Sequence, residues 1–292
     1  MKTRIISGIV MIALLCAFLT AGKLVSPLFI TALVASIAAV GIYELLRNAA
    51  GIKSTAAVAG ACVFSVLYIV FTDNSVRSTL LSLAAKDGYN GDVAVFTVRF
   101  YGNLSYAVSA LTVCWFVYAA VITLVCHKAF GLAQIAALFG FPLPYAAAFG
   151  KLSAICLHSD GIYYLLLLLN FSSVCDMGAY FVGSAVGKHK LCPEISPHKT
   201  VEGAVGGIVS SIIITVVLGL CFNKNLAAPA LLTVPLCVLG MVGDLFASAI
   251  KRAAGIKDYG NLIPGHGGIM DRVDSIIMIA PVLHVLISFG VI

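Results

Sequence analysis

The chain has 292 residues, of which 61% are hydrophobic and only 10% are charged, and its mean hydropathy is +1.07. A soluble domain carries about 25% charged residues, so this composition excludes an ordinary water-soluble protein. The net charge of +6 comes from basic residues in short loops between apolar runs. That pattern is typical of orientation in a membrane, and we expect no nucleic-acid partner.

Apolar runs long enough to cross a bilayer recur along the whole chain. A crossing helix needs about 20 mostly apolar residues. The first run resembles a signal peptide, but Thr20-Ala21-Gly22 is a poor cleavage site, so we expect an uncleaved first helix. The predicted spans lie at 5–21, 25–46, 55–71, 104–126, 130–149, 161–183, 204–222, 226–247 and 276–292.

These runs predict an all-α fold, a polytopic transmembrane helical bundle of about nine spans with a polar cavity facing the cytoplasm. We divide the chain into N-terminal transmembrane helices, residues 1–170, and a C-terminal catalytic region, residues 171–292. With the N-terminus inside, basic residues are twice as frequent inside as outside, as in proteins of the cytoplasmic membrane. The polar stretch near 72–103 is then an external loop.

Two polar segments, 184–203 and 251–275, flank the apolar hairpin formed by 204–222 and 226–247. Two crossings return the chain to the side on which it began. Both polar segments therefore face one compartment, whatever the number of earlier spans, and they can share one site.

Acidic residues are concentrated in the C-terminal region. A carboxylate at membrane depth is costly and usually has a cation, a metal or a water-filled cavity as its partner. Seven of the twelve acidic residues follow position 175, and they are Asp176, Glu194, Glu202, Asp244, Asp258, Asp271 and Asp274.

Asp244 ends a long apolar run and shares a helical stripe with Ser248 and Lys251, while Arg252 flanks that stripe. A hard oxygen ligand, a hydroxyl and a cation on one face suit a phosphate and a divalent metal. The alternative is a charge that reaches toward water at a helix end.

The next stretch, 257–268, contains glycines and a proline that prevent a regular helix. Glycines allow backbone N–H groups to approach an anion closely, as in phosphate-binding loops. His266 either contacts a phosphate or braces the loop. The candidate substrate contacts of this loop are Lys257, Asp258, His266, Gly267 and Gly268.

Asp271 and Asp274 open the last apolar run and share a helical face, with Arg272 between them. A structural cap at the helix start is the alternative interpretation. Mg²⁺ prefers carboxylate oxygens, water and substrate phosphates. Together with Asp244 and Lys251, these residues predict a magnesium–triphosphate site, in which nucleotidyl transfer depends on positioning and on cations.

The earlier polar segment, 187–203, is basic and is broken by prolines before it enters a helix with Gly203, Gly206 and Gly207. The small residues would allow close helix contact. Lys199, Thr200 and the helix start could hold phosphate, and Asp176 is a secondary site candidate; an ordinary basic loop is the alternative.

The C-terminal motifs resemble the phosphatidate cytidylyltransferases, also called CDP-diglyceride synthases. The resemblance extends to the opening residues 3–8, to 43–46, to 176–183 and to 196–203, which adds Ser196 and Glu202 to the candidate substrate contacts. Ser184 departs from the arginine that is common in the family. The motif itself reads Ser248-Ala249-Ile250-Lys251-Arg252, Lys257-Asp258, Pro264-Gly265-His266-Gly267-Gly268 and Asp271-Arg272-Val273-Asp274.

This resemblance implies a homodimeric, magnesium-dependent enzyme of phospholipid biosynthesis that joins CTP to phosphatidic acid, giving CDP-diacylglycerol and pyrophosphate. It places the catalytic metal at Asp244 and Asp271, with a second cation, K⁺, also allowed. It implies catalytic roles for Lys251 and Asp274 beside these two aspartates. Positions suited to the triphosphate or the lipid phosphate are Lys251, Arg252, Lys257 and Arg272.

Two other functions fit parts of the sequence. A CTP-dependent polyprenol or phytol kinase would transfer a terminal phosphoryl group instead. A multi-pass transporter fits the composition, but the charges concentrate in the C-terminal third and no inverted repeat of broken helices is evident.

Overall fold

The computed structural model describes residues 17, 20, 26–74, 76–78, 104–265 and 267–292. The chain forms two compact units, Met1–Leu157 with Asp258–Met270 and His158–Lys257 with Asp271–Ile292. Most of the predicted first span and of the predicted external loop lies outside the described residues. The predicted division after residue 170 stays a prediction.

Seven helical segments among the described residues are long and apolar enough to cross a membrane. Each coincides with one predicted run, so the chain is a multi-pass, mainly helical membrane protein, as predicted. The last predicted run overlaps helix α13 (Met270–Ser288), which is not among the seven, so the number of spans stays a prediction. The seven segments are Leu28–Ala49, Thr55–Thr72, Tyr106–Val125, Leu132–Cys156, Gly161–Val186, Val201–Cys221 and Ala227–Ala253.

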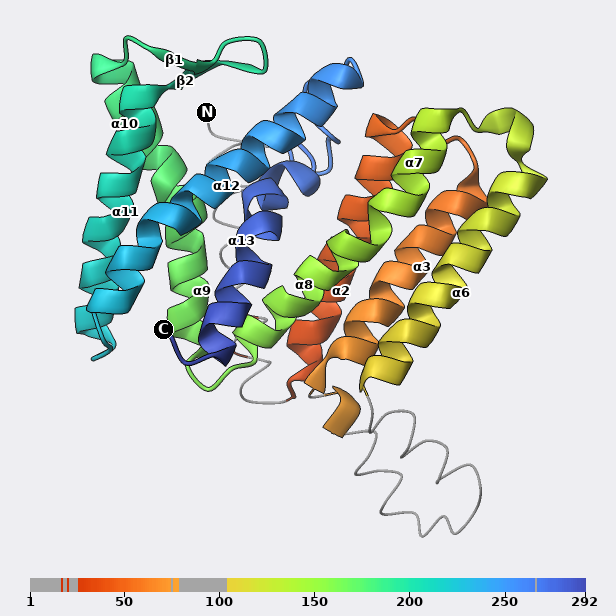
Figure 1. Cartoon of the computed structure of the whole chain (residues 1–292), viewed down its shortest axis with the longest axis horizontal. Coiled ribbons are helices and arrows are strands. Elements are labelled where there is room, and N and C mark those ends of the chain that lie inside the picture. The colour runs from red at the N-terminus through yellow and green to blue at the C-terminus, as the bar shows by residue number, and fades with distance from the viewer. Residues whose placement is uncertain (1–16, 18–19, 21–25, 75, 79–103, 266) are drawn as a thin grey trace, which may run out of the picture. The chain divides into compact units, whose positions relative to one another are not determined.

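The first unit is a helical bundle in which α3 contacts α2, α6 and α8 (Figure 1). Ala38 of α2 and Ala57 and Ala61 of α3 are completely buried, and such small side chains let helix backbones approach closely. A π-helical turn, η1, continues α2, and a 3₁₀ turn, η2, follows α6. The elements are α2 (Leu28–Glu44), η1 (Leu45–Ala49), α3 (Thr55–Thr72), α6 (Leu104–Val125), η2 (His127–Ala129), α7 (Leu132–Gly140) and α8 (Pro142–Cys156).

Asp73, at the end of α3, is buried in this bundle, although the sequence placed it in the external loop. Its carboxylate accepts hydrogen bonds from the hydroxyls of Thr31 and Ser153, both at 2.8 Å. Because these hydroxyls solvate the charge, Asp73 can join α2, α3 and α8 instead of facing water.

The second unit contains helices and one small antiparallel hairpin, in which Lys190 pairs with Thr200 and Cys192 with Ser196. The all-α prediction therefore missed β1 and β2. The helices on either side of the hairpin, α10 and α11, lie side by side (Figure 1). The elements are α9 (Gly161–Leu169), η3 (Asn170–Val174), α10 (Cys175–Val186), β1 (Lys190–Cys192), β2 (Ser196–Thr200), α11 (Val201–Cys221), α12 (Ala227–Ala253) and α13.

Glycines hold α10 and α11 together at close range, as the spacing of small residues predicted. A Cβ added at Gly207 would collide with the carbonyl oxygen of Cys175 and lie 3.1 Å from its sulfur. A Cβ at Gly203 would lie 3.2 Å from the Cα of Gly183. This packing fixes the start of α11, and with it the strand β2 that precedes it.

Replacing Gly207 with valine should force the two helices apart and lower the thermal stability of the purified protein in detergent, by about 1–3 kcal/mol for an overpacked core. Val205→Leu is the matched control, because it also enlarges a side chain of this helix, but at an exposed position. Equal melting temperatures for the two variants would contradict the role given to Gly207.

Candidate functional site

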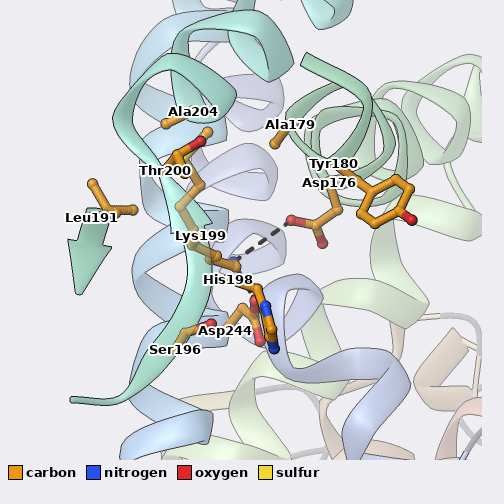
Figure 2. A pocket seen from close by; sticks show the side chains of 11 residues that line it. Asp176, Ala179, Tyr180, Leu191, Ser196, His198, Lys199, Thr200, Ala204 and Asp244 are labelled. Atoms are coloured by element: carbon orange, nitrogen blue, oxygen red, sulfur yellow. Dashed lines mark ion pairs between the residues drawn. The ribbon is translucent and has the colours of Figure 1, made fainter. Parts of the chain in front are cut away.

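Lys199, in the first of the two predicted polar segments, lies between two carboxylates. Its ammonium forms an ion pair with the carboxylate of Asp244 on α12 and lies 3.8 Å from a carboxylate oxygen of Asp176 on α10. Figure 2 shows the lysine between residues of different elements. Two carboxylates that would repel each other thus share one cation.

The surroundings of Lys199 keep its side chain charged. Burial alone would lower the pKa of Lys199, but the carboxylates of Asp244 and Asp176 outweigh that effect and hold the pKa above its usual value. Lys199 is therefore a permanent cation at neutral pH, available to a carboxylate or to a phosphate.

A cavity of about 320 Å³ opens beside this lysine (Figure 2). Its lining combines charged, polar and apolar side chains, which suits an amphiphilic ligand. The sequence predicted Asp176, Ser196, Lys199, Thr200 and Asp244, and missed the others. The remaining lining residues are Ala179, Tyr180, Leu191, His198, Ala204 and Met241.

A second ion pair joins the end of α12 to the beginning of α13. Lys251 Nζ lies 2.7 Å from a carboxylate oxygen of Asp271, and both residues are buried. Burying two charges is favourable only when they remain paired and hydrogen-bonded. Lys251 and Asp271, both predicted as catalytic, therefore depend on each other structurally.

Asp274 belongs to the same group of charges. Its carboxylate accepts a hydrogen bond from the backbone N–H of Ser275 at 2.8 Å, and the charges of Asp244, Lys251 and Asp176 act on it. Ser248 lies on α12 between Asp244 and Lys251 in a half-buried position. The second unit thus gathers most of the predicted charged residues in one neighbourhood.

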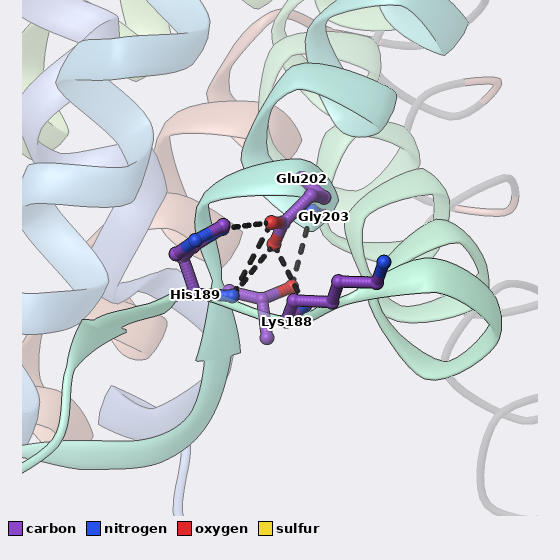
Figure 3. A network of polar contacts seen from close by, with 5 residues as sticks. Lys188, His189, Glu202 and Gly203 are labelled. Carbon is purple, nitrogen blue, oxygen red and sulfur yellow. Dashed lines mark hydrogen bonds and ion pairs between the residues drawn. The ribbon is translucent and has the colours of Figure 1, made fainter.

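Thr200 and Glu202 shape the hairpin that carries Lys199. The Thr200 hydroxyl accepts a hydrogen bond from the backbone N–H of Gly203 at 3.1 Å and caps α11. The Glu202 carboxylate accepts hydrogen bonds from the backbone N–H groups of Lys188 at 3.1 Å and His189 at 3.2 Å, and lies 2.6 Å from His189 Nδ1 (Figure 3). The structure gives both residues a local role in positioning the strand.

The glycine-rich stretch lies in the first unit, between the end of α12 and the start of α13. Gly265 and Gly267 have φ of 78° and 82°, values that favour glycine. The backbone N–H of Ile263 donates to the carbonyl of Gly267 at 2.9 Å and closes a tight loop, as the glycines and proline predicted. His266 lies outside the described residues.

Three basic residues and one acidic residue lie at or beyond the ends of this loop in the sequence. Lys257, Arg252 and Arg272 are exposed, and so is Asp258. One guanidinium nitrogen of Arg252 donates to the backbone carbonyl of Ile256 at 3.2 Å. These side chains are available to an anionic ligand.

Sequence reasoning missed the part that Glu44 plays in this loop. Its carboxylate accepts a hydrogen bond from the backbone N–H of Met270 at 2.9 Å and lies against Gly260 and Gly268. A lone carboxylate inside an apolar run was the available signal, since such residues are costly and need a partner.

Asp244 and Asp271 carry the kind of oxygen that Mg²⁺ takes when it is bound together with substrate phosphates. Among the described residues, no three His, Cys, Asp or Glu side chains are grouped closely enough to hold a metal by themselves. Mg²⁺, however, is usually bound by one or two carboxylates plus phosphates and water. Asp244 and Asp271 offer such oxygens, each beside a lysine that could turn to a phosphate.

Replacing Lys251 with methionine should remove the lysine partner of the buried Asp271 carboxylate and destabilise the protein by about 3–5 kcal/mol. The double change Lys251→Met with Asp271→Asn should recover much of that loss, because the charge is removed as well. Thermal unfolding of the three proteins in one detergent measures this, and a double variant no more stable than Lys251→Met would refute the pairing.

The chain matches a family model over nearly its whole length and individual proteins over less than half of it. The model of the cytidylyltransferase family matches residues 2–289. The phosphatidate cytidylyltransferase of Staphylococcus haemolyticus is 44% identical over 131 residues, which cover 44% of this chain and 50% of that protein. Those of Staphylococcus saprophyticus and Staphylococcus aureus are 45% and 42% identical over alignments of the same length and coverage.

The aligned region spans about half the length of these relatives. The family match covers more of the chain and includes both groups of charges described above. The chain therefore belongs to the cytidylyltransferase family.

Proposed function

We propose that this protein is a phosphatidate cytidylyltransferase, which transfers the cytidylyl group of CTP to phosphatidic acid and releases pyrophosphate. The observation that carries the proposal is Lys199, held between Asp176 and Asp244 in a cavity lined by both polar and apolar side chains. An acidic lipid, which joins a phosphate to apolar acyl chains, matches this mixed lining. The names of the relatives support the same reaction.

In the proposed reaction, an oxygen of the phosphatidate phosphate attacks the α-phosphorus of CTP. A new P–O bond forms, and the bond between the α-phosphorus and the bridging oxygen of pyrophosphate breaks. The attacking phosphate is already ionised near neutral pH, so no protein group has to remove a proton. Lys199 and Lys251 would stabilise negative charge on the phosphate oxygens, together with the exposed Arg252, Lys257 and Arg272.

Asp244 and Asp271 would hold Mg²⁺ in this proposal, with K⁺ as a further cation. A bound magnesium ion would neutralise charge on the phosphates and align the triphosphate. Asp274 lies close enough for its charge to influence Asp244, and it would tune or complete the ligand set. The lysines now paired with Asp244 and Asp271 would then be released toward phosphate oxygens.

The basic residues of the second unit also support a location of the site on the cytoplasmic side of the membrane. The hairpin residues Lys188 and Lys190 and the exposed Arg252, Lys257 and Arg272 fit the cytoplasmic side under the positive-inside rule. We propose that the protein lies in the cytoplasmic membrane, with its site facing the cytoplasm, and that it acts as a homodimer.

Proteoliposomes containing the purified chain, labelled CTP, Mg²⁺ and phosphatidic acid should form a lipid-soluble cytidine product and pyrophosphate. Asp244→Asn and Asp271→Asn should each reduce turnover by at least about a hundredfold, because a metal ligand is lost. Asp160→Asn is the matched control, since this acid pairs with Lys224 at 2.8 Å in the same unit, away from the cavity.

Release of CDP in place of pyrophosphate would instead indicate a lipid kinase. Solute flux without any lipid product would indicate a transporter. Full turnover in either aspartate variant would remove that residue from the proposed metal site.

Removing divalent metal with a chelator should abolish turnover, and added Mg²⁺ should restore it. Phosphatidic acid should bind the chelated protein more weakly, because Lys199 then stays paired with Asp244. Equilibrium binding of a labelled phosphatidic acid in nanodiscs, measured beside turnover, checks both statements. Turnover that persists after complete chelation would exclude the magnesium proposal.

A further inference from the structure

Glu44 is a buried acid that contacts the glycine-rich loop from the end of a helix. It is the last residue of α2, at the point where the helix widens into the π-helical turn η1, and only 3% of it is exposed. An ionised carboxylate in such a place must be satisfied by donors from the protein. One of them is the backbone N–H of Met270, at the end of the glycine-rich loop.

Two glycines of the loop are shaped around this carboxylate. A Cβ added at Gly268 would lie 2.6 Å from the carboxylate carbon of Glu44, and one added at Gly260 would lie 2.9 Å from it. Any side chain at either position would displace the acid. The requirement for glycine at these two positions therefore comes from Glu44, whereas the sequence alone attributed the glycines to phosphate approach.

Asn48 holds the same loop from the next turn of the chain. Its side-chain amide donates to the carbonyl of Tyr259 at 2.6 Å, and Tyr259 itself is completely buried. Glu44 and Asn48 are four residues apart and so project from neighbouring positions on the helical path. Together they fix the loop at both its ends, near 259–260 and near 268–270.

We propose that Glu44 and Asn48 are positioning residues that set the backbone of residues 258–265 and 267–270, the described part of the glycine-rich loop, for binding the phosphates of a nucleoside triphosphate. This inference rests on the proposed function for its ligand, but the positioning itself does not depend on the reaction. The loop's N–H groups bind an anion best when the loop already has a defined conformation. A mobile loop would have to become ordered each time it bound the anion, and that ordering costs binding free energy. A carboxylate, which accepts hydrogen bonds and donates none, can hold N–H groups without binding the phosphate.

The first test compares two buried acids of the same unit. Glu44→Gln should raise the KM for CTP by about tenfold with kcat changed by less than about threefold, the pattern of lost uniform binding. Asp73→Asn removes a buried carboxylate that accepts hydrogen bonds from the hydroxyls of Thr31 and Ser153 and from the backbone N–H of Val76, so it should lower thermal stability and leave the KM for CTP unchanged. Equal effects of the two variants on KM would overturn the proposal.

The second test uses a double-mutant cycle to probe the contact itself. Gly268→Ala should raise the KM for CTP in the wild-type chain, and should have a much smaller effect when Glu44→Ala has already removed the carboxylate. Gly140→Ala is the matched control, because a Cβ there meets nothing within 4 Å. Equal effects of Gly268→Ala in both backgrounds would show that the contact is unimportant.

Amide hydrogen exchange separates failure of this inference from failure of the proposed reaction. In the full chain without CTP, Glu44→Gln should speed exchange across 258–270 by about tenfold, and Asn48→Ala, at an exposed position, by a smaller factor. Asp73→Asn should leave exchange in that stretch unchanged. Unaltered exchange in a folded Asn48→Ala or Glu44→Gln variant would refute the positioning role even if CTP proves not to be the substrate.

Discussion

The structure depends on how an apolar helical bundle accommodates negative charge. Carboxylates are expensive in such surroundings, and Asp176, Asp244 and Asp271 of the second unit each form an ion pair with a lysine. Lys199 lies between Asp176 and Asp244, and Lys251 is paired with Asp271. Because these pairs link β2, α10, α12 and α13, they fix the relative positions of the elements of the second unit.

The same pairing explains how a site for phosphates could be ready before its ligand arrives. A buried lysine beside a carboxylate is stable, but it can exchange that partner for a phosphate when a cation takes over the carboxylate. Such an exchange keeps the local charge balanced at each stage, so it avoids the large penalty of an isolated buried ion. In the proposed reaction, metal-bound CTP would bring the cation and the phosphates together.

The sequence predicted the features that rest on hydrophobic periodicity and on spacing along the chain. It anticipated seven spans that the structure describes and close helix contact at Gly203 and Gly207. These follow from local composition and from the spacing of small residues. The ion pair of Lys199 with Asp244 was not predicted.

The features that sequence reasoning missed depend on contacts between distant residues. The β1–β2 hairpin forms in a segment too short and polar to show a strand pattern. Burial of Asp73 depends on hydroxyls from two other helices, and the contact of Glu44 with Met270 spans 226 positions. The hydrogen-bond partners of Asp73 and Glu44 cannot be identified from one sequence, because nothing in the local pattern indicates which distant groups will contact each carboxylate.

The central claim is that Asp244 and Asp271 together hold the metal that accompanies a nucleotide. Mn²⁺ can stand in for Mg²⁺, and the electron paramagnetic resonance signal of free Mn²⁺ reports binding directly in the purified chain. With CTP present, the wild-type chain should deplete that signal, and Asp244→Asn or Asp271→Asn should each weaken Mn²⁺ binding by at least about tenfold. Wild-type affinity for Mn²⁺ and CTP in both variants would contradict the claim.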